Sequence, residues 1–167
     1  MINSITNANA YLNGNKLAGK LEELELPAIK MKMEDVSALG LYGDTEIPVG
    51  MEKLEAKFKW NSVYRENWKD QSPFQATRLT VKSDMVTNAA GGQVQHNPVT
   101  VTIAGTFKEF PLGTLKAGAK QDGLEHTMTV TYLKVEVGGQ PLYEVDVFNN
   151  VYKVGGTDQL SGFKSNT

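Results

Sequence analysis

An alternation of charged and apolar residues runs through this chain and constrains its fold more than any other feature. In the segment 53–60, every even-numbered residue is apolar and every odd-numbered residue is charged. A period of two is typical of a β-strand with one buried and one solvated face, because successive side chains point to opposite sides. The segments 29–34, 99–108 and 143–147 alternate in the same way. These runs predict an all-β fold.

Turn residues and one irregularity divide the predicted strands. Asn13-Gly14 between short apolar pieces is a strong signal for a hairpin, and 137–140 predicts a second tight turn through Gly138 and Gly139. The alternation in 126–137 changes phase between Tyr132 and Leu133. This slip predicts a β-bulge, or a strand that leaves one sheet for another.

Only the segment 62–70 has a helical pattern. Ser62 is a suitable N-cap, and Val63, Tyr64 and Trp68 can face a core while Glu66 faces water. We therefore expect a single short α-helix in an otherwise β-sandwich or barrel-like subunit.

Two segments are predicted to be unusually long loops, and both ends of the chain are polar. Ser37–Gly50 is expected to join the strands 29–34 and 53–60 as a hairpin, while Ser83–Asn97 shows no periodicity. Loops of this length are usually functional or mobile. The ends, Met1–Ala8 and Ser161–Thr167, are expected to form arms or flexible tails. No linker divides the chain, so 1–167 is predicted to be one domain.

Composition excludes several classes of protein. The chain has 167 residues with 17 Lys and Arg against 19 Asp and Glu, a net charge of -2, which argues against a surface that binds nucleic acid or an anionic membrane throughout. It has no cysteine, which excludes disulfides, thiolate nucleophiles and cysteine-based metal sites. No signal peptide or membrane-spanning run is apparent. We expect a soluble protein from a reducing compartment, with no membrane partner.

No pattern of catalytic or cofactor-binding residues stands out. Gly14 to Leu21 resembles the start of a phosphate-binding loop, but Leu21 replaces the Ser or Thr that would hold magnesium. His96 and His126 lack metal-ligand spacing and are expected to be solvent-exposed or edge residues. The pair Glu144 and Asp146 could imitate a two-carboxylate site, but a solvated strand face explains it equally well. We therefore predict no enzyme, no metal site and no cofactor; a hydrolase remains an alternative.

Lysines gather on two of the predicted strands. If these strands pair, one face carries Lys30, Lys32, Lys53, Lys57 and Lys59, interrupted by Glu34 and Glu55. This face could meet a polyanion, but a solvated sheet face with cross-strand ion pairs is the favoured interpretation.

Long amphipathic strands need their edges protected from aggregation. A chain can close its own sheet, which would make a barrel that carries a small ligand, or it can share the sheet with further copies. Charged strand faces, long loops and the lack of a chemical site favour the shared sheet.

Several motifs, in order along the chain, resemble one known family. Near the start, Leu12-Asn13-Gly14 precedes Leu24-x-Leu26-Pro27, and in mid-chain Gly105-x-x-Lys108-Glu109 precedes Gly113-x-x-Lys116-x-Gly118. The C-terminal third contains Tyr132-Leu133-x-Val135-x-Val137-Gly138-Gly139, Leu142-x-Glu144-x-Asp146, Asn150 and Gly155-Gly156-x-Asp158-Gln159-Leu160. Together they look like the major tail tube protein of contractile phage tails, the P2-like FII family, which includes the tubes of R-type bacteriocins. The segment 83–97 matches poorly.

The resemblance implies a structural protein of the virion tail, assembled in the cytoplasm of the host bacterium. Six subunits would form a ring whose strands close into one barrel, and rings would stack into a tube that passes double-stranded DNA without specific binding. The implied partners are further copies of the chain, the tail sheath, the baseplate and the tail terminator. A DNA-free tube of a bacteriocin or contractile injection system is the alternative. The implied contact to the neighbouring ring is a loop comprising Leu39, Gly40, Leu41, Tyr42, Gly43, Asp44, Thr45, Glu46, Ile47 and Pro48.

Two sets of residues are candidates to line the lumen of such a tube. The hairpin around 37–50 is expected to line it, yet the threonine-rich strand faces suit a channel for DNA better, because cationic side chains would hold phosphates. The candidates are Lys30, Lys32, Glu34, Lys53, Glu55, Lys57, Lys59, Thr100 and Thr102.

Overall fold

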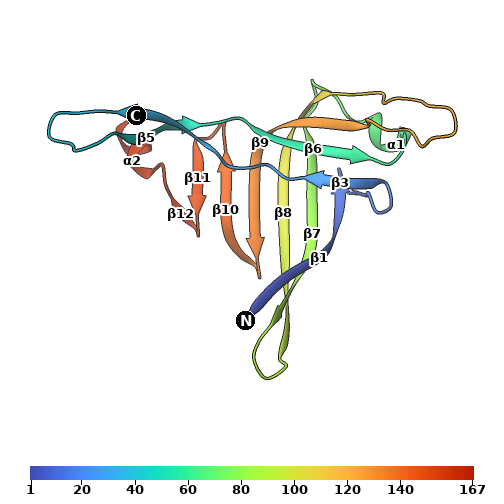
Figure 1. Ribbon diagram of the computed structural model, residues 1–167, viewed down its shortest axis with the longest axis horizontal. Coiled ribbons are helices and arrows are strands. Elements are labelled where there is room, and N and C mark those ends of the chain that lie inside the picture. The colour runs from blue at the N-terminus through green and yellow to red at the C-terminus, as the bar shows by residue number, and fades with distance from the viewer.

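The computed structural model describes residues 1–167, which form twelve strands and two short helices (Figure 1). The strands are β1 (Ile2–Leu12), β2 (Asn15–Lys16), β3 (Leu21–Glu25), β4 (Met31–Val36), β5 (Thr45–Met51), β6 (Leu54–Trp60), β7 (Thr77–Asn88), β8 (Val94–Glu109), β9 (Glu125–Val137), β10 (Gln140–Asp146), β11 (Val151–Val154) and β12 (Thr157–Asp158). The helices are α1 (Arg65–Trp68) and α2 (Ser161–Asn166). The predicted all-β fold is confirmed. Neither helix has the length and apolar character needed to span a membrane.

Ten strands belong to one antiparallel sheet that folds over itself. Its main path runs β12-β11-β10-β9-β8-β7-β1-β2, while β6 pairs with the first half of β9, and β3 pairs with β6. In Figure 1, β3 and β6 run across the strands β7 and β8. We call β1, β7, β10, β11 and β12, with 94–104 of β8 and 132–137 of β9, the large layer. The small layer comprises β3 and β6 with 105–109 of β8 and 125–130 of β9.

The strands β8 and β9 turn the corner between the two layers at a bulge. Ala104 pairs with Tyr132 but Gly105 pairs with Val130, which leaves Thr131 as the extra residue. A Cβ on Gly105 would lie 1.9 Å from the carbonyl oxygen of Thr129, so only glycine fits at this corner. The bulge lies next to the phase slip in the sequence and confirms the interpretation of that slip.

The core lies between the layers. The even-numbered residues of β6 are buried, as their alternation predicts, and Phe58 packs on Phe107 with ring centroids 5.1 Å apart. From the large layer, Leu79 and Ile103 join the same cluster and are fully buried. Full burial of each such side chain contributes about 1.5–3 kcal/mol, so this shared cluster holds the two layers together.

The strands β4 and β5 form a separate two-stranded sheet, which with the connecting residues 37–44 we call the arm (31–51). The predicted pairing of 29–34 with 53–60 is therefore wrong, because β4 pairs with β5, and β6 pairs with β3 and β9. Alternation indicates which face of a strand is buried but does not identify its neighbour. In Figure 1 the arm extends beyond β12 at one side of the molecule.

The segment 83–97 is a hairpin and not the predicted loop. The strands β7 and β8 continue through it and pair as far as Asn88 and Val94, and Gly91 and Gly92 form the turn with positive φ angles. Polar residues occur on both faces of this part of the sheet, so the sequence shows no apolar alternation there although the backbone pairing continues. The hairpin projects below the rest of the molecule in Figure 1.

The chain ends and the helices also differ from expectation. The N-terminal segment forms most of β1, which pairs with β7, and 161–166 forms α2, so there are two helices instead of one. The helix predicted over 62–70 is reduced to α1, and Tyr64, not Ser62, occupies the N-cap position. Both predicted hairpin turns are confirmed, with positive φ at Asn13-Gly14 and at Gly138-Gly139.

Candidate functional site

The outer face of the large layer is a broad polar surface. Cross-strand pairing aligns one row of its side chains across six strands: Thr80, Thr102, Lys134, Glu144, Lys153 and Asp158. Thr100 lies on the same face, between Lys82 and Glu136. The alternation of β8 places these polar residues outside because Val99, Val101 and Ile103 point into the core. We call this surface the polar face.

The charges on the polar face nearly balance. The anionic side chains Asp84, Glu136, Glu144, Asp146 and Asp158 are opposed by the cationic Arg78, Lys82, Lys134 and Lys153. Five negative and four positive charges leave a net charge of -1 on this face.

Two charged groups of the polar face have shifted pKa values. Lys134 lies 3.0 Å from Glu136, and this carboxylate raises the pKa of the lysine. The backbone N–H of Leu160 donates to Asp158 and, with Lys164, lowers the pKa of that carboxyl. Both shifts favour the charged forms, so the balance of charge persists at neutral pH.

The outer face of the small layer carries most of the lysines noted in the sequence, and each has an acidic partner. Lys57 and Lys59 lie 3.8 Å from Glu125 and Glu22, respectively. Glu55 accepts hydrogen bonds from Lys108 and Lys53, and these two ammonium groups lower the pKa of Glu55 from 4.5 to about 2. This lysine face is therefore neutralised by ion pairs within the chain.

The structure separates the nine residues predicted for a lumen into three groups. Thr100 and Thr102 lie on the polar face, whereas Glu55, Lys57 and Lys59 lie on the lysine face, with Lys53 just before β6. The two layers share one core, so these faces point away from it in opposite directions. Lys32 and Glu34 belong to β4 in the arm, and Lys30 lies at its base. One surface cannot include all nine residues.

The arm exposes an unusual number of apolar side chains. Leu39 and Tyr42 in its connecting loop are fully exposed, and Met33, Leu41, Ile47 and Val49 are each 45–55% exposed. The loop is ordered locally by the N–H of Leu41, which donates to the carbonyl of Ala38, and by the hydroxyl of Ser37, which donates to Asp44. Of the residues predicted to contact a neighbouring ring, Leu39 to Asp44 lie in the loop and Thr45 to Pro48 in β5.

The sheet remains open at both edges of the large layer. On one side β1 pairs with β7, and its other edge meets only β2, through Tyr11 and Leu12. On the other side β12 is two residues long and covers only Lys153 and Val154 of β11. Unpaired N–H and C=O groups along such edges are templates for pairing with another chain.

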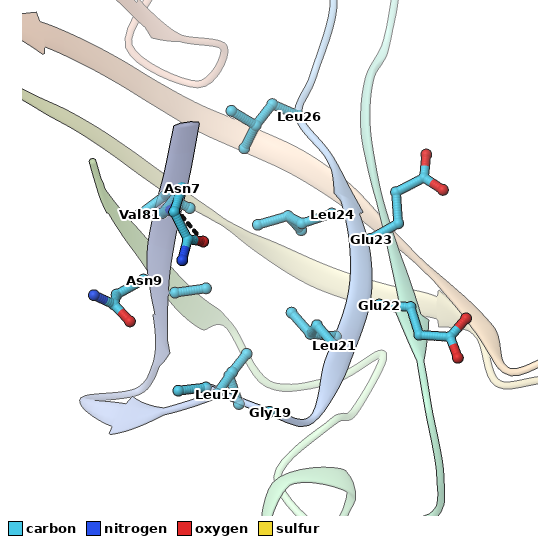
Figure 2. A pocket seen from close by; sticks show the side chains of 13 residues that line it. Asn7, Asn9, Leu17, Gly19, Leu21, Glu22, Glu23, Leu24, Leu26 and Val81 are labelled. Atoms are coloured by element: carbon cyan, nitrogen blue, oxygen red, sulfur yellow. Dashed lines mark hydrogen bonds between the residues drawn. The ribbon is translucent and has the colours of Figure 1, made fainter. Parts of the chain in front are cut away.

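A second opening lies between β1 and β3, which are neighbours in space but do not pair. Figure 2 shows the hollow between them, about 400 Å³ in volume, into which Leu17, Leu21, Leu24 and Leu26 project. Val81 lines it from β7. We call this opening the seam. Sequence reasoning missed it, because the apolar residues of 17–26 indicate burial but do not reveal an absent neighbour.

The exposed area of the chain is large for its mass. A monomeric protein of 18.3 kDa exposes about 8,100 Å², whereas this chain exposes 10953 Å². The excess, roughly 2,800 Å², accompanies only 24 buried residues of 167. These surfaces fit a subunit whose fold is completed by contact with other chains.

The histidines form no catalytic pair. His126 was expected at the surface, but it is buried against Trp68, with Gln71 2.5 Å from Nδ1 and the Pro111 carbonyl oxygen 3.3 Å from Nε2. Burial lowers the pKa of His126, which favours the neutral ring. The side chain of His126 is buried because the core-facing alternation of β9 continues to the beginning of the strand. His96 lies on β8 with Nδ1 2.5 Å from Asp84. No cluster of three or more His, Asp or Glu suitable for a metal occurs in the structure.

Comparisons with known proteins point to one family. The family model for phage tail tube protein FII matches residues 2–167. The chain is 23% identical over 168 residues to the tail tube protein of Escherichia phage P2, which covers 95% of this chain and 92% of that protein. It is 26% identical over 150 residues to the major tail tube protein of Serratia phage KSP20, with 87% and 84% covered. The resemblance predicted from the sequence motifs is thereby confirmed.

Proposed function

The chain belongs to the phage tail tube protein FII family, and from this premise we propose that six copies close into a ring and that such rings stack into the inner tube of a contractile tail. Members of this family are structural components of the virion tail and not a class of enzymes. The observation that carries the proposal is the excess of exposed surface on the isolated chain, about 2,800 Å² over a monomer of this mass.

Ring closure uses the two free edges of the large layer. The edge of β1 in one copy pairs with the edge formed by β11 and β12 in the next, so the sheet continues from copy to copy. Since a contact between two different surfaces closes into a ring when the rotation allows it, this geometry gives a cyclic assembly without unpaired edges.

The polar face lines the lumen. Continuation of the sheet through its edges places the outer faces of all large layers on one side of the resulting barrel. Each neutralised phosphate adds a salt-dependent contribution to binding, and a face with net charge -1, on which Lys134 is paired with Glu136, has no excess of cations for that purpose. DNA therefore passes without specific binding. The same lumen suits a DNA-free bacteriocin or injection tube.

The other surfaces contact the rest of the tail. The lysine face of the small layer points away from the lumen, toward the tail sheath. Residues 39–48 of the arm reach the neighbouring ring, and the ends of the tube meet the baseplate and the tail terminator. Assembly takes place in the cytoplasm of the host bacterium, before the tail becomes part of the virion.

Negative-stain microscopy with light scattering tests the proposal on purified protein. We expect rings or long tubes, with scattering that rises steeply with protein concentration. A stable monomer at every concentration would contradict the proposal and would favour the alternative of a single-chain ligand-binding barrel.

A further inference from the structure

We propose that, within the ring, the arm of each copy lies over the seam between β1 and β3 of its neighbour and fills the hollow there with the apolar side chains of β4 and β5. This inference rests on the proposed ring. It assigns a partner to two surfaces that the pairing of strand edges leaves uncovered.

The arm extends the apolar surface of the core, but no other part of the chain packs against this extension. At its base, Met51 packs against the core of the same chain, and Met31 pairs with it across the hairpin. Met33 follows Met31 on the same face of β4 by the period of two, but it is 47% exposed. Pro48 on β5 pairs with Met33 and lies on the same face, whereas Ile47 pairs with Glu34 on the opposite face. The apolar surface of the core thus continues outward along one face of the arm, through Met33 and Pro48.

The seam has the complementary property, because its apolar side chains line an open hollow that no other segment of the chain fills. Leu17 is buried, Leu21 and Leu24 are half-buried, and Leu26 is 39% exposed at the rim. In Figure 2 these leucines project into the hollow, whereas Glu22 and Glu23 point away from it. A hollow of about 400 Å³ has room for several aliphatic side chains.

The positions of the two surfaces indicate a second copy as the occupant. The arm extends beyond the β12 side of the large layer, and the seam lies at the β1 side. When the β12 edge of one copy meets the β1 edge of the next, the overhanging arm is carried onto the neighbour's seam. The contact joins two different surfaces at opposite sides of the molecule, so it repeats around the ring and closes with it.

The available area agrees with this occupant. A standard interface hides about 800 Å² per partner, or about 1,600 Å² for a copy that uses both of its sides, which is within the excess area of this chain.

Paired cysteines test the contact directly, since the chain has no cysteine of its own. The test variant combines Met33→Cys on the arm with Asn7→Cys at the seam, both exposed in the single chain. Treatment of assembled protein with a short bismaleimide is expected to give a ladder of covalent multimers that ends at the ring size. The matched control combines Met33→Cys with Thr100→Cys on the polar face and is expected to remain monomeric under the same treatment.

Microscopy of the same samples separates this inference from the proposed function. Rings that give only monomers for the seam pair, or a ladder for the control pair alone, would overturn the placement of the arm while the ring itself stands. Absence of rings from the unmodified protein would overturn both.

Discussion

At the scale of single residues, Gly105 shows how one position controls the path of two strands. It lies where β8 and β9 turn from the large layer into the small one, beside the bulge at Thr131. The backbone of Thr129 approaches so closely that no side chain fits. The corner brings β6 over β7 and β8 and so encloses the core.

The substitution Gly105→Ala is expected to destabilise the chain by about 3 kcal/mol, because the added methyl group meets a backbone carbonyl oxygen and the clash cannot be relieved by a rotamer change. Urea denaturation, followed by the fluorescence of Trp60 and Trp68 near the core, measures the loss. The control Gly162→Ala adds a methyl group where no atom lies within 4 Å. A stability of Gly105→Ala equal to that of the control would contradict the assigned role of the corner.

The sequence predicted some of these residues and not others, for physical reasons. The buried positions of β6 and the turns at Asn13-Gly14 and Gly138-Gly139 depend on local patterns, and all were confirmed. The phase slip at 132–133 predicted the bulge, but the glycine opposite it was not recognised. Its requirement arises from the approach of β9, which is distant in the sequence. The prediction that His126 lies at the surface was wrong for a similar reason, since side chains that bury it come from α1 and the segment after β8.

At the scale of elements, the arm is the part of the chain whose shape depends least on packing against the rest of the chain. It is a hairpin with its own small sheet, and its loop carries the two fully exposed residues Leu39 and Tyr42. Exposed apolar side chains at the tip of a long loop usually mark an interaction site. In the proposed tube, this tip contacts the next ring.

Replacement of residues 37–44 by Asn-Gly is expected to abolish stacking and leave single rings. Val36 and Thr45 are the last pair of the hairpin, and a two-residue type I′ turn can join them without disturbing β4 or β5. The apolar strands of the arm remain, so contacts within the ring persist while the contact to the next ring is lost. Electron micrographs that show tubes of normal length would rule out the stacking role of the loop.

Strand identity was easier to predict than strand pairing. The run 53–60 is β6, yet its neighbours are β3 and β9 and not the strand before the long loop. Alternation defines the buried face of a strand, whereas its partner depends on contacts between distant segments. The hairpin through 83–97 was missed because polar residues occur on both of its faces. Backbone pairing there requires no hydrophobic pattern.

At the scale of the whole molecule, the isolated chain is an incomplete structure. It combines open strand edges, an open seam, an uncovered arm and an exposed area well above that of a monomer of its mass. The sequence indicated a shared sheet through its amphipathic strands, but it could not show which surfaces remain open. The open surfaces depend on how the two layers are arranged, and the alternation of residues does not specify that arrangement.

The whole-molecule arrangement also separates the threonine-bearing polar face from the lysine face. The two sets lie on opposite sides of the core, so a tube that has one of them in its lumen has the other outside. The polar face belongs to the layer with free edges and is the one that can continue from copy to copy. The lysine face belongs to the layer that crosses above it.

Cryo-electron microscopy of the assembled protein, at a resolution that shows side chains, tests this account most directly. The account predicts six-fold rings in which Thr102 and Lys134 line the bore and the strands continue from β1 of one copy into β11 and β12 of the next. A bore lined by Lys57 and Lys59, or rings in which the large layers do not join, would contradict it.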